Sequence, residues 1–537
     1  MMSSRVHALS SFSDDPEDGA VAGRDGRSTR RYDGRVSSRS ADELATSDSL
    51  VVARRLQGAG DIDGAVLAAL SGWLEVLVDG RAAEMDSFLA LLPDPQADDA
   101  DVLAVRACCA RMRGDRAGSR LLMARSRSVR DHGEESPLFS LFVEDDEDLV
   151  AEAIEEVVSI IEQGRLRGRS HAYAVYVAGW TLLRSRRDPL RACELLESAR
   201  ADAAARGFTV LAARAAANLA FAFAFMGALT LALSTLNSND MPEDGPWRLY
   251  DGGIQDAALG LIRYWRGELS AARTAFTAVI QGYSDAPYAH FARVFAALVA
   301  AEVGGSEARI EALAELQKVP QVTLLGVPWR SWRAIAECAL ARARGDRSTT
   351  IRLARQVLRA DNVPVATALA ADALRWAGDV DGARAALGRI STSAPPGYLV
   401  ASVGVTRALV AYRAGDTRTA HFRLEQALDA AADEQSLLPF CRDEEALRRL
   451  LRSHVSAGTR HEVMLATILG RTQEETSALS SLSGRERQVL AHLRTTMTPA
   501  EIAVALDVSL NTLKTHQRAI YRKLGVSTRR AATRLRE

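Results

Sequence analysis

The chain contains almost no lysine, and its few cysteines are scattered. Only three of its 67 basic residues are lysines (Lys318, Lys514 and Lys523), and the last two lie close to the C-terminus. The five cysteines are odd in number and form no CxxC pair, which argues against a disulfide framework and against a zinc site. This cysteine usage is typical of a reducing compartment, so we predict a cytoplasmic protein that holds no metal ion or cofactor.

The sequence also lacks the signals of secretion and of nucleotide hydrolysis. The N-terminal stretch MMSSRVHALSSFSDD has no apolar core of signal-peptide length. No GxxxxGK motif occurs, and no glycine is followed by lysine, so the phosphate-holding loop of ATPases is missing. We therefore predict that the protein is not an enzyme.

The net charge of the chain is close to zero but unevenly distributed. From Ser483 to Glu537 there are eleven lysines and arginines against four acidic residues, which gives this segment a net charge of +7. Because the whole chain carries −1, residues 1–482 carry −8. A basic segment on a mildly acidic body predicts a polyanionic partner for that segment alone.

The longest stretch without charge lies between Arg214 and Asp240 and includes LAFAFAFMGALTLALSTL. By length it reaches the span of a bilayer, so a membrane helix is one interpretation. The many alanines, the polar Asn218 and the central Gly227 favour the other interpretation, in which two buried helices meet at Gly227. We therefore predict no membrane segment.

Residues 1–47 are rich in serine, aspartate, glycine and arginine and contain few large apolar side chains. Such a segment cannot bury enough surface to offset the entropy of ordering it, so we predict a disordered tail. The arginines of this tail could add loose affinity for DNA, but a solvated segment is the favoured interpretation.

Residues 48–455 have a helical pattern with a recurring element and no strand alternation. In this element a glycine, usually followed by an acidic residue, precedes a small residue by five positions. It occurs as Gly60-Asp61…Ala65, Gly114-Asp115…Ser119, Gly227…Ala232, Gly267-Glu268…Ala272, Gly345-Asp346…Thr350, Gly378-Asp379…Ala383 and Gly415-Asp416…Ala420, with Arg187-Asp188…Ala192 and Gly304 as degenerate members. From residue 187 onward the intervals are 40, 40, 37, 41, 33 and 37 residues, a period typical of stacked helical hairpins.

The chemistry of this element is local. Glycine ends the first helix because it adopts a positive φ without penalty, and the acidic residue then starts the second helix, where the helix dipole favours it. The region resembles the tetratricopeptide-like domain of MalT-like regulators, without their ATPase domain. That resemblance implies a curved solenoid whose concave face binds an effector, and it leaves open whether the effector is a peptide, a protein or a small molecule.

Isolated aromatic and histidine side chains in this region have ordinary interpretations. Trp265 and Trp376 each precede a turn glycine by two residues, which favours packing over ligand recognition. His171, His290 and His421 are isolated and lack HExxH spacing, so we interpret them as surface or core histidines.

Residues 456–481 lack the repeat element and predict a linker, and residues 482–537 predict a small helical domain. Its helix starts can be recognised from their caps, which are the capping boxes Ser483-Gly484-Arg485-Glu486 and Thr498-Pro499-Ala500-Glu501, then Ser509 after a turn at Asp507-Val508, and Ser527 after Gly525 ends the third helix. A helix, a tight turn and a second helix make a helix-turn-helix unit.

The predicted third helix has two distinct faces at about 100° per residue. Four side chains share one face and should pack inward, namely Leu513, Gln517, Ile520 and Leu524. Five polar or cationic side chains share the other face, namely Asn511, Lys514, Thr515, Arg518 and Arg522. An outward stripe of amide, hydroxyl and cationic groups suits the base edges and phosphates of a major groove.

The segments SGRERQVL, AEIAVAL and VSLNTLKTHQRAIYRKLGVSTR resemble the LuxR-type DNA-binding domain. The resemblance implies four helices, contact with double-stranded DNA through Asn511, Lys514, Thr515 and Arg518, and positions near phosphates for Ser509, Thr512, Arg522 and Lys523. His516 matches a histidine of the family, for which we favour a packing role. The family's fourth helix commonly pairs two subunits, so the resemblance implies a possible homodimer. Only about ten residues of that helix are present here, which puts dimerisation through it in doubt.

Together these features predict an all-α protein with a tetratricopeptide-like solenoid followed by a four-helix LuxR-type helix-turn-helix domain. The predicted function is that of a bacterial transcription regulator in which the solenoid is a sensor or interaction module. The alternative is an interaction scaffold with a vestigial helix-turn-helix. A sigma-factor domain has a similar helix-turn-helix, but the sequence KLGVSTR favours the LuxR type.

Overall fold

The structure is a computed structural model. It describes residues 48–130, 136–166, 169–185, 188–240, 245, 247, 251–284, 287–324, 327–360, 363–390, 395–442, 444–470, 483–495, 497–523 and 529. The tail predicted for residues 1–47 lies outside the described residues.

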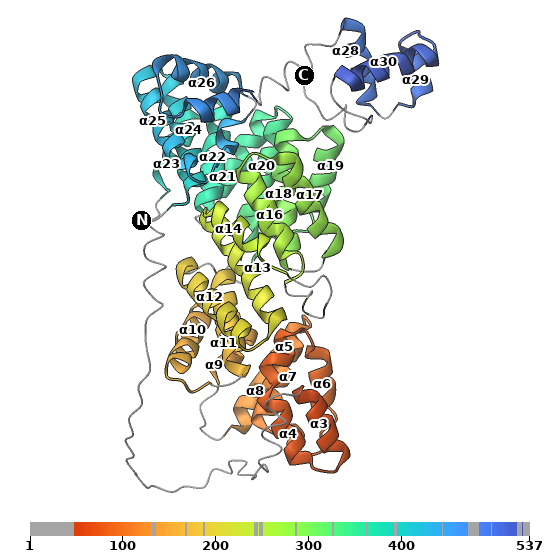
Figure 1. Ribbon diagram of the computed structural model, residues 1–537, viewed down its shortest axis with the longest axis vertical. Helices are drawn as coiled ribbons and strands as arrows, with labels where there is room; N and C mark the ends of the chain where they lie inside the picture. Colours follow the sequence, from red (N-terminus) through yellow and green to blue (C-terminus); the bar gives the residue numbers. More distant parts are fainter. Residues whose placement is uncertain are drawn as a thin grey trace.

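Helices make up almost all of the regular structure in the described part of the chain (Figure 1). The N-terminal helices are α3 (Ser49–Gly58), α4 (Ile62–Ser71), α5 (Trp73–Val78), α6 (Ala82–Leu89), α7 (Ala100–Met112), α8 (Arg116–Val129), α9 (Pro137–Val143), α10 (Glu147–Glu162), α11 (Arg169–Ser185), α12 (Pro189–Ala205), α13 (Thr209–Met226) and α14 (Leu229–Asn237). The central helices are α16 (Ile254–Trp265), α17 (Leu269–Gly282), α18 (Pro287–Val303), α19 (Ser306–Leu316), α20 (Trp329–Ala343), α21 (Arg347–Arg359), α22 (Pro364–Ala377), α23 (Val380–Gly388), α24 (Gly397–Arg413), α25 (Thr417–Ala432) and α26 (Glu445–Ala457). The C-terminal helices are α28 (Gly484–Leu493), α29 (Pro499–Ala505) and α30 (Leu510–Lys523), and two short 3-10 helices are η2 (Gln96–Asp98) and η3 (Leu438–Phe440).

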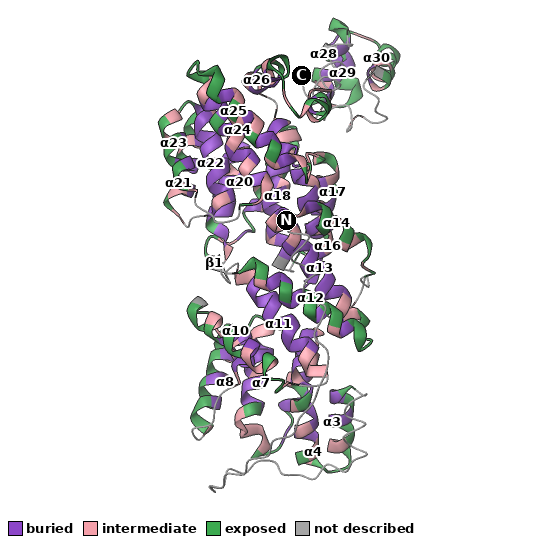
Figure 2. Cartoon of the chain, turned by 60° about the vertical axis from the view of Figure 1, so that its left-hand side comes forward, coloured by how far each residue is buried: buried purple, intermediate pink, exposed green. Residues whose placement is uncertain are grey.

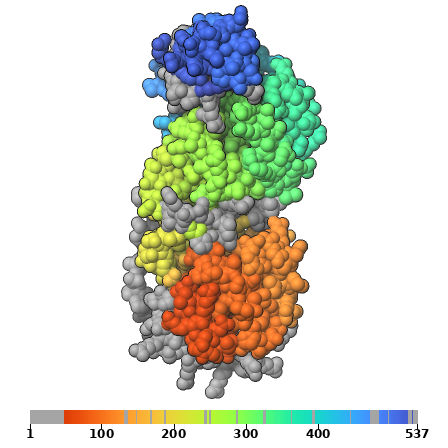
Figure 3. All heavy atoms as spheres, turned by 90° about the vertical axis from the view of Figure 1, so that its right-hand side faces the viewer, coloured from red at the N-terminus to blue at the C-terminus, as the bar shows by residue number. Residues whose placement is uncertain are grey.

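Consecutive helices pair into hairpins, and the hairpins stack in chain order along the long axis of the molecule (Figures 1 and 3). From α11 onward the first helix of each hairpin packs on the first helix of the next, as α16 does on α18 and α20 does on α22. This is the solenoid arrangement that the repeat period predicts, because a hairpin with one apolar face is buried by its neighbours.

The predicted turn element is confirmed in its geometry. The seven glycines of the element that precede a second helix have φ between 74° and 100°: Gly60, Gly114, Gly227, Gly267, Gly345, Gly378 and Gly415. Where aspartate follows, its side chain caps the second helix, and Asp346 accepts a hydrogen bond from the backbone N–H of Thr349 at 3.0 Å. The small residue five positions on is buried in every described hairpin of this kind, as Ala272 and Ala420 are.

Two details between α18 and α20 differ from the prediction. Gly304 does not adopt a positive φ, since α19 starts from an extended Gly305 at φ −72°. The chain also forms one two-residue antiparallel ladder, β1 (Thr323–Leu324) with β2 (Val327–Pro328), where no strand was expected.

The uncharged stretch after Arg214 forms α13 and α14, which meet at Gly227 with φ 88° as predicted. Among the described helices, α13 is long and apolar enough to cross a membrane, and 61% of it is buried inside the protein. Its Phe221 belongs to one of the two largest apolar clusters and its Leu219 to the other. Packing on both sides explains why this helix is apolar all round.

A buried polar network ties α13 to its neighbours. The Arg214 guanidinium contacts the Asp251 carboxylate at 2.6 Å, and both side chains are almost fully buried (1% and 0% exposed). Asp251 also accepts hydrogen bonds from the Tyr176 hydroxyl at 2.6 Å and from the Asn218 side-chain amide at 3.3 Å. Arg214 further donates to the Val78 carbonyl at 2.7 Å, so the ion pair has hydrogen-bond partners on both sides.

The solenoid curls back on itself between α13 and α25. The Tyr398 hydroxyl at the start of α24 donates to the Phe225 carbonyl near the end of α13. Glu434 accepts a hydrogen bond from the Thr230 backbone N–H at 2.7 Å, across 204 residues of sequence. These contacts join the α13–α14 hairpin to the α24–α25 hairpin.

After α25 the chain runs back across the first helices of several hairpins, including α16 and α24. This return segment (residues 437–442 and 444) includes η3, which packs on α16 and α24, and it buries Leu438 and Phe440 almost completely. Its Arg442 pairs with Asp372 of α22, and its Glu444 pairs with Arg375 at 2.6 Å.

Packed structure continues beyond residue 455, where we expected the linker to begin. Residues 462–470 are helical, and Leu465 and Ile468 are fully buried in a cluster with α24, α25 and α26. The prediction missed this helix because it lacks the glycine turn of the repeats. Residues 471–482, the rest of the expected linker, lie outside the described residues.

Candidate nucleic-acid interface

The C-terminal domain begins with a complete capping box, as predicted. The Ser483 hydroxyl accepts from the Glu486 N–H at 3.2 Å, and the Glu486 carboxylate accepts from the Ser483 N–H at 2.6 Å. Helix α28 follows and buries Val489, Leu490 and Leu493.

The second capping box, at the start of α29, is also confirmed. The Thr498 hydroxyl accepts from the Glu501 N–H at 3.3 Å, and the Glu501 carboxylate accepts from the Thr498 N–H at 2.7 Å. The hydrogen bonds that the Glu501 carboxylate accepts from the backbone N–H and the hydroxyl of Thr498 hold its pKa below its ordinary value. Pro499 occupies the first helical position, and α29 buries Ile502 and Ala503.

The tight turn lies where the sequence placed it. Asp507 adopts a left-handed conformation with φ 51°, and the Val508 N–H donates to the Ala503 carbonyl at 2.9 Å. The Ser509 hydroxyl then accepts from the Thr512 N–H at 3.1 Å and caps α30. Helix, turn and helix therefore form a helix-turn-helix unit.

The inner face of α30 packs on the other two helices. Leu513 and Ile520 are fully buried in one cluster with Leu493 and Ile502. Gln517, which we expected to pack inward, is half-buried, and so is His516. Leu524, Gly525 and Ser527 lie outside the described residues, so the predicted fourth helix is not described.

The outer face of α30 is polar and exposed (Figure 2). The exposed side chains of the helix and its cap are Ser509, Asn511, Thr512, Lys514, Thr515, Arg518 and Arg522, while the Lys523 side chain is not among those described. Among the described residues, Lys514, Arg518 and Arg522 form no ion pair. The structure thus brings the predicted polar residues together on one solvent-facing surface.

Two arginines of this domain have structural roles that sequence reasoning missed. The Arg485 guanidinium donates to the Leu506 carbonyl at the end of α29. Arg529 donates to the carbonyls of Leu493 and Thr495 at 2.9 and 2.8 Å, just after α28. Both cations satisfy carbonyls that a helix end leaves without a partner, so part of the local positive charge holds the domain together.

Residues 480–536 match the family "Bacterial regulatory proteins, luxR family". The helix-turn-helix described above therefore belongs to a luxR-type domain. The chain is also 46% identical over 57 residues to the "Probable transcriptional regulatory protein SgaR" of Hyphomicrobium methylovorum. That similarity spans 11% of this chain and 27% of the length of the relative.

Among solved structures, the chain is similar to a tetratricopeptide repeat protein from Parabacteroides merdae, with 15% identity and a TM-score of 0.32. The similarity covers 57% of this chain and 98% of that protein. The N-terminal region is tetratricopeptide-like in its own glycine turns and in the stacking of its helical hairpins. The luxR-type domain follows these hairpins in the sequence and is not part of the repeat region.

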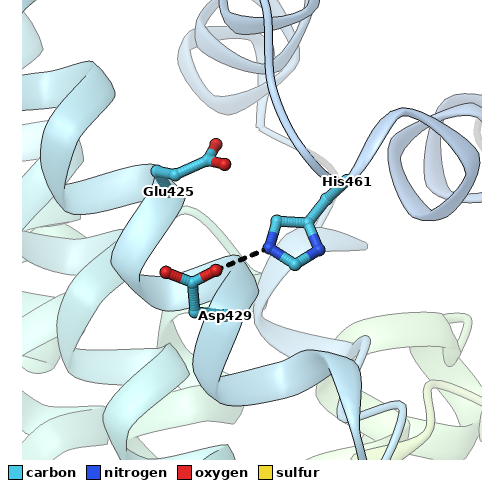
Figure 4. A group of neighbouring side chains, drawn as sticks. All are labelled: Glu425, Asp429 and His461. Atoms are coloured by element: carbon cyan, nitrogen blue, oxygen red, sulfur yellow. Dashed lines mark hydrogen bonds and ion pairs between the residues drawn. The ribbon is translucent and has the colours of Figure 1, made fainter.

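One group of side chains outside the luxR-type domain has the composition of a metal site (Figure 4). Glu425, Asp429 and His461 bring their ligand atoms within 4.8 Å of one another. Asp429 already accepts from the Arg460 guanidinium at 2.8 Å and from His461 Nε2 at 2.8 Å. Since a cation would have to displace Arg460, the group acts as a clamp that holds helix 462–470 on α25.

The same clamp corrects the interpretation of His421 as isolated. His421 Nδ1 lies 3.0 Å from His454 Nδ1, and His454 Nε2 lies 2.7 Å from the Glu425 carboxylate. Although burial alone would raise it, hydrogen bonds from Thr459, Arg460 and His454 lower the pKa of Glu425 to about 2. His171 is likewise partnered, by Asp202 at 3.0 Å.

Proposed function

We propose that the protein is a sequence-specific DNA-binding transcription regulator. The observation that carries this proposal is the exposed stripe of amide, hydroxyl and cationic side chains on α30, in a segment that matches the luxR family. In a helix-turn-helix the second helix enters the major groove and presents such side chains to base edges.

The proposed roles follow the position of each residue on α30. Asn511, Lys514, Thr515 and Arg518 contact DNA through the groove, where amide and guanidinium groups pair with adenine and guanine edges. Residues at the cap and at the flanks of the stripe lie near phosphates and fix the register, namely Ser509, Thr512, Arg522 and Lys523.

The remaining parts of the proposal concern the rest of the chain. Residues 48–455 and the helix that follows serve as a sensor or interaction module related to that of MalT-like regulators, without an ATPase domain in these 537 residues. The chain acts in the cytoplasm as a non-enzymatic regulator, alone or as a homodimer. Residues 471–482 connect this module to the DNA-binding domain.

Genome-wide recovery of bound DNA tests the proposal. The intact protein should give discrete promoter peaks, and a Lys514→Ala/Arg518→Ala variant should lose them because two groove contacts are worth about 1–3 kcal/mol each. The matched control is Arg352→Ala/Arg418→Ala, which removes the same charge from exposed positions on α21 and α25 and should keep the peaks. Equal, diffuse recovery by all three proteins would support the scaffold alternative instead.

The salt dependence of binding gives a second test. Phosphate contacts release counterions, so the affinity of the full chain for a promoter fragment should fall steeply as salt rises. In an Arg522→Ala/Lys523→Ala variant, which removes the two cations proposed to lie near phosphates, the slope of log K against log salt should be shallower by about one to two. A slope that does not depend on these residues would contradict their contact with DNA.

A further inference from the structure

A cavity of about 150 Å³ lies between the return segment and the first helices of four central hairpins. Its walls come from α16, α18, α20 and α22, and Arg442 of the return segment closes one side. Most of the lining residues have apolar side chains, although polar atoms contribute the larger part of the surface that faces the cavity. Cys338 is one of the lining residues, and burial raises the pKa of its thiol to about 12. A cavity of this volume holds a molecule of roughly six to ten non-hydrogen atoms.

Two of the three charged side chains in the cavity wall are cations, Arg342 and Arg442, and the third is Glu302. Both arginines contact the buried Asp372, and Arg342 Nη1 does so at 2.5 Å. Although burial alone would raise it, Arg375, Arg342 and Arg442 hold the pKa of Asp372 well below its ordinary value. Arg375 directs its Nε and both Nη groups at Asp372 and Glu444. Arg342 and Arg442, which line the cavity, have further N–H groups beyond those that contact Asp372.

Arg442 has a specific donor that its protein partners leave unused. Its Nε is enclosed, and among the described residues no acceptor lies within hydrogen-bond distance of it. The Glu302 carboxylate lies 3.7 Å from this Nε, and the Glu302 side chain is 25% exposed. Glu302 can therefore turn toward solvent and leave its place to a ligand carboxylate, which would accept from Nε at shorter range.

The aromatic side chains of the wall complete the chemistry. Trp376 is half-buried, and the centroid of its ring lies 5.7 Å from the guanidinium carbon of Arg342. The ring therefore provides a flat apolar surface in the cavity wall beside this cation. Tyr264 lines the cavity together with Glu302 and Arg442, and burial together with the charge of Glu302 raises the pKa of Tyr264. A protonated Tyr264 can donate a further hydrogen bond to an anion in the cavity.

We propose that this cavity binds a small aromatic carboxylate. The carboxylate accepts hydrogen bonds from Arg442 and Arg342 in place of Glu302, and the ring packs between Trp376 and the apolar wall. Arg442 belongs to the segment that leads to α26, so the ligand contacts the segment that precedes the last helices of the solenoid before the DNA-binding domain. This assignment deepens the proposed function by naming an effector class, and any effect of the ligand on DNA binding rests on that function.

Calorimetric titration of the full-length protein without DNA tests the site independently of DNA binding. The probes are benzoate, phenylacetate and the uncharged benzyl alcohol. Because the carboxylate gains charge-assisted hydrogen bonds, at least one acid should bind about tenfold or more tightly than benzyl alcohol. Failure of both acids to bind below about 10 mM, or binding no tighter than that of the alcohol, would overturn the proposal.

Two variants locate the site. Ala339→Leu fills the cavity from α20 without changing charge and should abolish binding of the acid, whereas Ala312→Leu, at a half-buried position of α19 outside the cavity wall, should leave binding unchanged. Arg442→Gln should reduce the preference for the acid over benzyl alcohol, with retained helicity by circular dichroism as the folding control. Tight binding of the acid by a folded Ala339→Leu protein would show that the site lies elsewhere.

Discussion

The solenoid and the luxR-type domain use the same kind of residue in opposite ways. In the solenoid, Arg214, Arg293 and Arg375 are largely buried, and each contacts a carboxylate. In the luxR-type domain, Lys514, Arg518 and Arg522 are exposed on α30 and form no ion pair with the described residues. The neighbours of a cation, and not its type, therefore decide whether it stabilises the fold or is free for a ligand.

The largest expected effect comes from breaking a buried pair of the solenoid. Arg214→Met leaves the Asp251 carboxylate buried beside Tyr176 without its cation, and should lower the free energy of unfolding by about 3–5 kcal/mol. The control Arg352→Met changes an exposed side chain and should be nearly neutral. Urea denaturation followed by circular dichroism measures both, and equal midpoints would contradict the role of the buried pair.

A smaller effect should follow the pH dependence of the clamp on α25. The lowered pKa of Glu425 means that its contribution to stability is complete above its ordinary value of 4.5 and is lost as pH falls toward about 2. As pH is lowered from 4.5 to about 2, the melting temperature should therefore fall more steeply for the natural protein than for Glu425→Gln. Asp381→Asn, at a side chain that is 95% exposed, is the control, and parallel curves for all three would refute the assignment.

The repeat turns should give an effect of about 1 kcal/mol at a single position. Gly345 has φ 77°, which an alanine side chain disfavours by about 1 kcal/mol, so Gly345→Ala should lower the midpoint of urea denaturation. Gly305 has φ −72° and open space around it, so Gly305→Ala should be almost silent. If both substitutions cost the same, the turn geometry is not what the repeat sequence encodes.

The smallest stability effect should come from the exposed stripe of α30. Lys514→Ala/Arg518→Ala should change the free energy of unfolding by less than about 0.5 kcal/mol, because neither side chain packs or pairs within the described protein. The same variant loses DNA binding under the proposed function. A large loss of stability would mean that these cations hold the fold, as Arg485 and Arg529 do.

The sequence predicted those features whose causes lie within a few residues. The Gly345-Asp346 turn and the capping box at Ser483 each depend on contacts three residues apart, so the residue pattern alone specifies them. The two faces of α30 follow from the helical period, which placed Leu513 inside and Lys514 outside. The predicted DNA contacts of α30 remain predictions.

Contacts between distant parts of the chain could not be predicted from the sequence. The contact of Glu434 with Thr230 depends on the summed rotation of many hairpins, to which each repeat adds a small angle. The helix at residues 462–470 was missed because its burial comes from packing on α25 and not from the repeat pattern.

The repeat turns, the capped helix starts of the luxR-type domain and the polar side of α30 could be predicted from the residues alone, because caps, turns and helical periodicity act locally. Only the tertiary structure shows that α13 and α14 contact α24 and α25, and that the return segment crosses the first helices of the central hairpins. It also brings Arg342, Arg442 and Trp376 into the wall of one cavity. Those side chains are separated by tens of residues in sequence, and only the accumulated curvature of the stacked hairpins brings them together.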